Sequence, residues 1–163
     1  MAPSGVDKGS VEPAALIEVN EHGEVMTGEG SASAETRLHL DIICHTEAGA
    51  VLHTHSANGT YLSKLHASKH GLTIGGWEML KGLAGITTHQ TEIHLPIVNN
   101  NQNMEKLSEA IRPLLKTAPH GFLVAGHGLY CWGRNLMEAR RHVEIHEFLL
   151  ELCWRNQLLG VNS

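Results

Sequence analysis

The sequence predicts a single domain of the α/β class (mixed α+β), and two observations carry that prediction. Short apolar runs typical of strands alternate along the chain with segments whose apolar residues recur at helical spacing. The length of 163 residues fits one domain that buries about two thirds of its unfolded surface. No internal repeat or low-complexity linker divides the sequence, so we expect one core over residues 1–163.

Composition narrows the class of function. The formal net charge of −5 argues against nucleic-acid binding, which needs a basic footprint, and no run of like charge suggests an anionic membrane. The longest apolar stretches are far shorter than the ~18–20 residues of a membrane span, and the N-terminus has no signal pattern, so we expect a cytoplasmic protein. Cys44, Cys131 and Cys153 lack CxxC spacing and predict reduced thiols in the core.

The chain begins with a predicted loop and hairpin. Residues 3–9 are rich in turn formers and backbone donors, with one cation, Lys8. Ser4 and the N–H groups of this loop could hold a phosphate, although small polar loops are common without one. The apolar runs 16–20 and 25–26 flank a turn, which is typical of a hairpin.

A helix is expected next, over residues 34–43. Ser33 fits its N-cap, and Leu38 and Ile42 supply an apolar stripe at helical spacing. Glu35 then lies in the first turn, where the helix dipole by itself favours a carboxylate.

The following strand, 51–55, carries a His-x-His pair. Because side chains on a strand alternate between faces, His53 and His55 point one way while Leu52 and Thr54 point the other. Neutral imidazole is the commonest side-chain ligand for Zn²⁺, so the pair could bind one metal ion. Two half-buried histidines satisfied by neighbours explain the pair equally well.

The remaining elements follow from the same patterns. In the predicted helix 57–66, Tyr61, Leu62 and Leu65 should face inward. Pro96, in the predicted strand 92–98, indicates an edge strand or a strand end. The last helix should turn Leu136, Ala139, Val143, Phe148, Leu149 and Leu152 inward. Strands are predicted at 71–74, 92–98, 121–125 and 129–133, and helices at 57–66, 104–115 and 135–158.

Two further places carry histidines of interest. His127 lies between Gly126 and Gly128 at the junction of two apolar strands, where it could reach a metal or be an ordinary turn residue. His142 and His146 have the i, i+4 spacing of a competing metal pair, but their charged neighbours indicate a solvated or interface face.

One carboxylate has an unusual setting. Glu78 lies between Trp77 and Met79, and large apolar neighbours raise the pKa of a carboxyl and suit it to acid–base work. A helical glutamate that faces solvent is the alternative interpretation.

Four stretches occur in the order and spacing of the class II aldolase/adducin family, and the chain resembles that family from Pro3 into the final helix. They are 33–36, 50–56, 78–82 and 126–133, the last reading Gly-His-Gly-Leu-Tyr-Cys-Trp-Gly. The resemblance implies a central mixed or antiparallel sheet flanked by helices on both sides. It also implies one Zn²⁺ per subunit, a sugar-phosphate substrate and a homotetramer.

The resemblance assigns roles position by position. His53, His55 and His127 match the three zinc ligands, and Glu78 matches the acid–base glutamate of a dehydratase, which is a lyase. Glu35 matches the active glutamate of the family's aldolases, so it could be catalytic or contact the substrate. Two rivals stay open: a sugar-phosphate aldolase or epimerase that uses Glu35, and a non-catalytic, adducin-like interaction module.

The phosphate side of the implied site is less complete. Ser4 and Gly5 match part of the family's phosphate-binding loop, and Lys8 adds a cation. Family members usually carry some dozens of residues before this stretch, including a helix and a Gly-Asn turn that helps bind phosphate. Met1 lies almost at the loop in this sequence, so that N-terminal part of the family pattern is expected to be missing.

Overall fold

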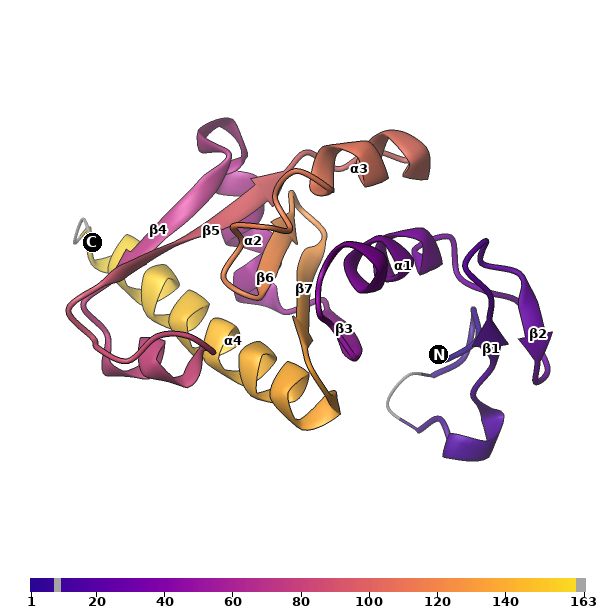
Figure 1. Ribbon diagram of the computed structural model, residues 1–163. Coiled ribbons are helices and arrows are strands. Elements are labelled where there is room, and N and C mark those ends of the chain that lie inside the picture. Colours follow the sequence, from indigo (N-terminus) through magenta and orange to yellow (C-terminus); the bar gives the residue numbers. More distant parts are fainter. Residues whose placement is uncertain (8–9, 161–163) are drawn as a thin grey trace.

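A five-stranded mixed sheet forms the centre of the computed structural model, which describes residues 1–7 and 10–160 (Figure 1). The strand order is β3-β7-β6-β5-β4, and every neighbouring pair is antiparallel except β5 with β6. The expected mixed sheet is therefore confirmed. The strands are β3 (Ala50–Thr54), β4 (Gly71–Gly75), β5 (Glu92–Val98), β6 (Gly121–Val124) and β7 (Gly128–Gly133).

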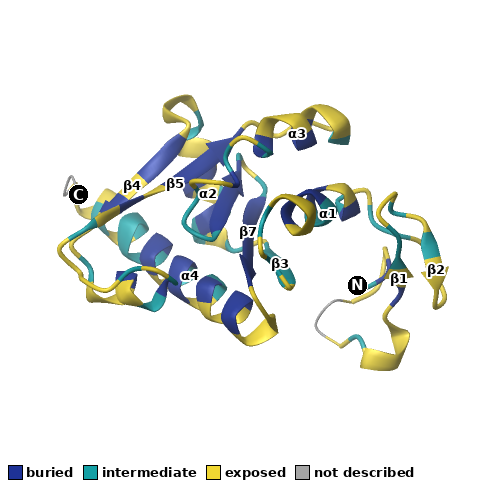
Figure 2. Cartoon of the chain, viewed as in Figure 1, coloured by how far each residue is buried: buried dark blue, intermediate teal, exposed yellow. Residues whose placement is uncertain are grey.

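Helices cover both faces of this sheet because its central strands are apolar on both sides. Side chains that alternate along β6 and β7 pack into two separate cores, one under each helical layer. In Figure 2 both strands are coloured as buried. Phe122, Val124, Tyr130 and Trp132 pack with α1 (Thr36–His45) and α3 (Met104–Ile111). Leu123, Leu129 and Cys131 pack with α2 (Ala57–Leu65) and α4 (Leu136–Leu159).

The N-terminal segment lies beyond α1, at the side of the molecule away from β4 (Figure 1). It contains the predicted hairpin, β1 (Glu18–Val19) and β2 (Val25–Thr27), which pair antiparallel. The Met1 ammonium donates to the Ile17 carbonyl at 2.7 Å, which ties the start of the chain to this hairpin. Three short 3₁₀ helices complete the element order: η1 (Pro13–Ala15), η2 (Ala67–Lys69) and η3 (Glu78–Gly82).

Some predicted boundaries shift. The helix expected from residue 34 begins at Thr36, with Glu35 at its N-cap, because residues 34–35 form a turn closed by the Thr36 N–H on the Ser33 carbonyl. Helix α3 ends at Ile111 rather than at 115, since Pro113 has no N–H to continue the ladder.

The predicted inward faces are partly wrong. Leu62 is buried, but Tyr61 and Leu65 are half exposed on α2. On α4, Leu136 and Phe148 are exposed although they were expected to face inward. Of the two alternatives for Pro96, the edge strand is wrong, because β5 lies between β4 and β6. The strand end agrees with the structure, since β5 ends at Val98, shortly after Pro96, and its pairing with β6 begins at Ile97.

The cysteines and the lengths of the helices can be compared with what the composition predicts. Cys44, Cys131 and Cys153 are all free thiols, but Cys44 is exposed and so is not the core residue predicted. Among residues 1–7 and 10–160, no helix is both long enough and apolar enough to cross a membrane.

His142 and His146 are fully buried within α4 of a single chain, so the prediction of a solvated or interface face is wrong. His142 accepts a hydrogen bond from the Ala84 N–H at 3.2 Å and donates from Nδ1 to the Trp132 carbonyl at 2.6 Å. His146 donates from Nε2 to the Pro119 carbonyl at 2.9 Å. These backbone contacts make the pair part of the core, where neutral rings hold α4 to its neighbours.

This burial predicts acid sensitivity. Burial lowers the pKa of His146 from 6.5 to about 4, so the unfolded chain binds a proton at a higher pH than the folded chain does. Stability from this group is complete above pH 6.5 and is lost as the pH falls toward about 4, by about 3 kcal/mol. Urea unfolding across this window should show the loss.

The matched variant is His146→Gln, which keeps an N–H for the Pro119 carbonyl but cannot titrate. Its unfolding free energy should depend less on pH, by about 1.4 kcal/mol per pH unit in this window. His22→Gln, at an exposed position, should keep the parental dependence. Equal pH dependence in His146→Gln and parent would contradict the assignment.

Candidate metal centre

The antiparallel pairing of β3 with β7 places the first two histidines. His53 is opposite Tyr130, and its Nδ1 donates to the Leu129 carbonyl at 2.9 Å, which leaves the lone pair on Nε2. His55 follows two residues later on the same face, and its Nε2 lies 2.7 Å from that of His53. The period-two prediction is thus confirmed, and two ring nitrogens converge on one point.

The third histidine comes from the turn between β6 and β7. Gly126 has φ of +64°, a left-handed conformation that glycine adopts without strain. A Cβ on Gly128 would lie 2.1 Å from the Thr54 carbonyl and about 3 Å from both β3 imidazoles. Glycine at 128 therefore lets the turn approach β3 closely enough for His127 to face the pair.

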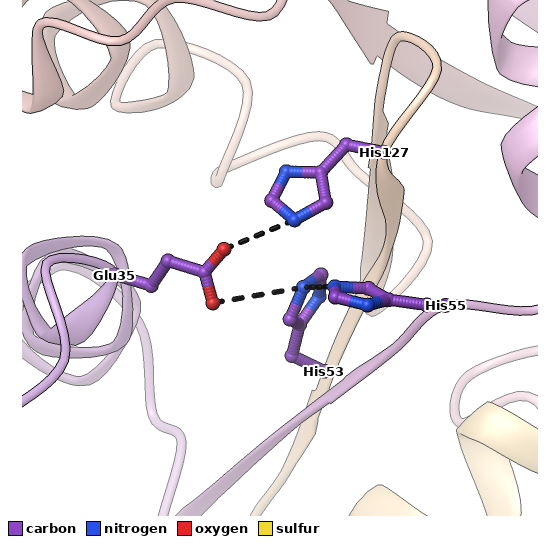
Figure 3. A group of neighbouring side chains, drawn as sticks. All are labelled: Glu35, His53, His55 and His127. Atoms are coloured by element: carbon purple, nitrogen blue, oxygen red, sulfur yellow. Dashed lines mark hydrogen bonds and ion pairs between the residues drawn. The ribbon is translucent and has the colours of Figure 1, made fainter. Parts of the chain in front are cut away.

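Glu35 completes the group from the other side. Its carboxylate oxygens lie 3.0 Å from Nε2 of His127 and 3.8 Å from Nε2 of His53, as Figure 3 shows. One ligand atom from each of the four residues lies within 4.8 Å of the others. Three converging imidazoles are a donor set that suits a divalent transition metal, and Glu35 places a carboxylate beside them, so these residues fit the predicted metal site.

Neighbouring side chains hold these ligands in place. Tyr130 stacks on the His53 ring with centroids 4.0 Å apart, and Phe122 stacks on the far side of Tyr130 at 5.1 Å. The Thr54 hydroxyl, between the two ligands but on the opposite face, donates to Glu147 of α4 at 2.7 Å. Such contacts fix ring orientation and strand position.

Electrostatics favour metal-binding forms. Burial lowers the pKa of His53 to about 3, so this imidazole stays neutral, the form that binds a metal. Burial and the nearby Glu35 carboxylate raise the pKa of Tyr130 above its usual range, so the phenol keeps its proton.

A cavity of about 290 Å³ opens beside this group. Glu35 and His127 form part of its wall, and Tyr130 lines it as well. Its remaining lining includes the apolar Leu38, Met104 and Leu107 and the amides Asn100, Asn101 and Gln102. A substrate here would meet the reactive groups together with both apolar and hydrogen-bonding surfaces.

Sequence reasoning missed Tyr130, Glu147 and the loop 100–102. Tyr130 lies in a run that indicates a buried strand, although a phenol in such a run is itself a signal of a polar partner. Glu147 and the amide loop gave no sequence signal, because only the fold brings them to the site.

Glu78 is not in this group. Its side chain is 66% exposed on η3, where it pairs with Lys81 and lies 3.2 Å from Nδ1 of His89. The expectation that apolar neighbours raise its pKa is wrong for this chain: the hydrogen bond from the Lys81 ammonium lowers the pKa of Glu78. Within the described residues of one chain, the carboxylate beside the imidazoles is Glu35.

The predicted phosphate loop lies near the segment that carries Glu35. The Ser4 N–H donates to the Ser31 carbonyl at 2.8 Å, which places the loop against residues 28–33. Ser4 and Gly5 are both exposed. Lys8 lies outside the described residues.

A mixed α/β domain with three histidines and a glutamate around one point defines a candidate metalloenzyme. The family model for the class II aldolase and adducin N-terminal domain matches residues 1–154, so this chain belongs to the class II aldolase and adducin family. The predicted family is thereby confirmed.

Within this family, the chain is similar to several proteins that share one name. The chain is 43% identical to methylthioribulose-1-phosphate dehydratase of Serratia proteamaculans over 159 residues, covering 96% of this chain and 78% of the relative. It is 42% identical to the protein of that name from Xanthomonas campestris pv. campestris, covering 90% and 69%. The Yersinia pestis protein of that name is 40% identical, covering 98% and 73%.

Solved structures share the fold. YgbL of Escherichia coli superposes with a TM-score of 0.79 at 24% identity, covering 95% of this chain and 72% of that one. An L-fuculose 1-phosphate aldolase superposes with a TM-score of 0.77 at 20% identity, covering 98% and 70%. At these identities the likeness is one of fold.

The geometry predicts that metal binding depends on the three imidazoles. His55→Ala and His127→Ala should each lose most bound metal after metal-replete purification, because each removes one of the converging donors. Metal content by mass spectrometry and the metal-dependent rise in Tm would measure this.

The control is His89→Ala, which changes an exposed histidine outside the group. It should bind as much metal as the parent does. A His127→Ala chain with the parental metal content and Tm rise would contradict the assignment.

Proposed function

We propose that this chain is a zinc-dependent methylthioribulose-1-phosphate dehydratase of methionine salvage. The reaction converts 5-methylthioribulose 1-phosphate to 5-methylthio-2,3-dioxopentyl phosphate. The observation that carries the proposal is the convergence of His53, His55, His127 and Glu35 beside a cavity, in a chain about 40% identical to proteins of that name. The three histidines also argue against a non-catalytic module.

The dehydration needs a base and an acid. The C3–H bond breaks, its electron pair forms a C3–C4 double bond, and the C4–O bond breaks as the hydroxyl leaves with a proton as water; the enol product then becomes the 2,3-diketone. When bound to the three imidazoles, zinc would supply a Lewis acid for a substrate oxygen. The protein must supply the groups that move protons.

Two carboxylates are proposed for this work. Glu35 lies on the wall of the cavity, next to His127, where it can deliver a proton to the leaving hydroxyl. Glu78 is proposed to remove the C3 proton, and its pairing with Lys81 keeps it ionised as a base must be. Because Glu78 is exposed and outside its own chain's group, we propose that it serves a neighbouring subunit of a homotetramer.

The remaining assignments are part of the same proposal. Ser4, Gly5 and Lys8 would hold the substrate phosphate, and the Ser4 contact with Ser31 supports a place near Glu35 for the first two. The three free thiols agree with a reducing compartment, so we propose that the enzyme works in the cytoplasm.

The zinc-loaded chain should form the diketone from 5-methylthioribulose 1-phosphate and should cleave no C–C bond of fuculose- or ribulose-type phosphates. Glu35→Gln and Glu78→Gln should each lower kcat by about 10²-fold or more with zinc content unchanged, because each loses a proton-transfer group. Diketone absorbance and aldehyde release would measure the two reactions.

Glu109→Gln changes an exposed glutamate of α3 and should keep the parental rate. Parental turnover by Glu78→Gln would refute its catalytic role. Aldehyde release without diketone would refute dehydration and favour the aldolase.

Mixed tetramers would test where Glu78 acts. Glu78→Gln and His127→Ala chains, each inactive alone, should regain activity when refolded together, because one subunit offers an intact imidazole group and its neighbour an intact Glu78. Activity measured against native mass spectra of the mixture would show the effect.

The matched control pairs Glu35→Gln with His127→Ala. Glu35 and His127 belong to one group, so every site in a mixed tetramer still contains one of the two defects when each group comes from a single chain. This mixture should stay inactive. Failure of the Glu78 mixture to regain activity, despite mixed tetramers in the spectra, would show that Glu78 does not act across subunits.

A further inference from the structure

The hydroxyl of Tyr130 has no hydrogen-bond partner among the described residues, although Tyr130 is fully buried. A buried phenol normally finds an acceptor, because desolvating a donor without one costs free energy. An unpaired donor of this kind therefore calls for an explanation.

The Tyr130 ring is held in place and cannot rotate to give its hydroxyl another partner. Tyr130 is held between His53 at 4.0 Å and Phe122 at 5.1 Å, with interplanar angles of 18° and 9°. The register of β7 fixes its backbone opposite His53 on one side and opposite Phe122 on the other. The position of the phenol is therefore set by three neighbouring strands.

Tyr130 is one of the residues around the cavity that Glu35 and His127 also line. Glu35 is close enough for its charge to act on the phenol, but no hydrogen bond joins them. The acceptor that Tyr130 lacks within the described residues can thus be supplied by a molecule in this cavity.

We propose that the Tyr130 hydroxyl donates a hydrogen bond to an oxygen of a polyol phosphate bound in this cavity, and so is a further catalytic residue. The inference rests on the proposed function, whose substrate carries hydroxyl oxygens at C3 and C4. A neutral donor beside Glu35 orients such an oxygen without adding charge, and the site then has no unpaired phenol.

Tyr130→Phe tests this, because it removes the oxygen and keeps the ring between His53 and Phe122. The zinc-loaded variant should keep the parental zinc content and Tm. Its kcat/KM for 5-methylthioribulose 1-phosphate should fall by about 10-fold or more, as expected when one hydrogen bond to the reacting substrate is lost.

A second measurement uses an unreactive ligand. The polyol phosphate made by borohydride reduction of the substrate keeps the hydroxyl oxygens but cannot be dehydrated. Calorimetric titration should show weaker binding to Tyr130→Phe than to the parent. The chain has one other tyrosine, Tyr61; Tyr61→Phe removes a phenol oxygen from the exposed surface of α2 and should match the parent in both assays.

The outcomes separate the two proposals. Unchanged kcat/KM and unchanged polyol binding in Tyr130→Phe would overturn the Tyr130 contact while dehydration stands. A shifted pH profile with unchanged polyol binding would also overturn it, since Tyr130 would then act through Glu35. Loss of zinc or a lower Tm would show a structural role instead. A parent that binds the polyol but forms no diketone would overturn dehydration alone, and a parent that does neither would overturn both.

Discussion

The antiparallel pairing of β3 with β7 is the constraint on which the rest of the site depends. It sets His53 opposite Tyr130 and brings the end of β3 against the turn that carries His127. The pairing is tight because Gly128 has no Cβ to collide with the Thr54 carbonyl. Since β3 is an edge strand, its other anchor is on α4, where Glu147 accepts from Thr54. One ladder and one side-chain bond thus place three imidazoles around a point.

Local pattern was enough to predict most of the fold. The apolar runs of β6 and β7 indicated buried strands, because both faces of each strand lie under helices. The pattern failed where burial depends on which helix covers which face. His142 and His146 have charged sequence neighbours, yet they point into the core because backbone carbonyls of Trp132 and Pro119 accept their hydrogen bonds. Those partners are distant in sequence, so helical spacing could not reveal them.

The residues of the candidate site likewise fall into those that local sequence pattern predicts and those that it does not. His53 and His55 follow from period two alone, and the glycines beside His127 indicated a turn that could approach another strand. Glu35 could be assigned only by family resemblance, because its place depends on how α1 lies on the sheet. Glu78 shows the opposite limit. Family resemblance gives Glu78 a catalytic role, but its side chain is exposed on η3 and lies outside the group of imidazoles in its own chain. The proposed role therefore depends on how subunits assemble, and the sequence of one chain does not predict that.

Glu35 is held differently from the imidazoles, and this difference suits the acid–base role proposed for it. His53 is fixed by strand pairing and by ring stacking, and His127 lies in the tight turn between β6 and β7. Glu35 stands at the N-cap of α1, which rests on the sheet through apolar contacts of Leu38 and Ile42. A half-buried ion pair from Arg112 to Asp41, at 2.9 Å, joins α1 to α3. Because Glu35 is the last residue before that helix, its carboxylate can change partners by side-chain rotation while the helix and the ladder keep their places. The proposed role of Glu35 as a proton carrier needs that freedom, and the three proposed ligands of one metal ion need the rigidity that the sheet gives them.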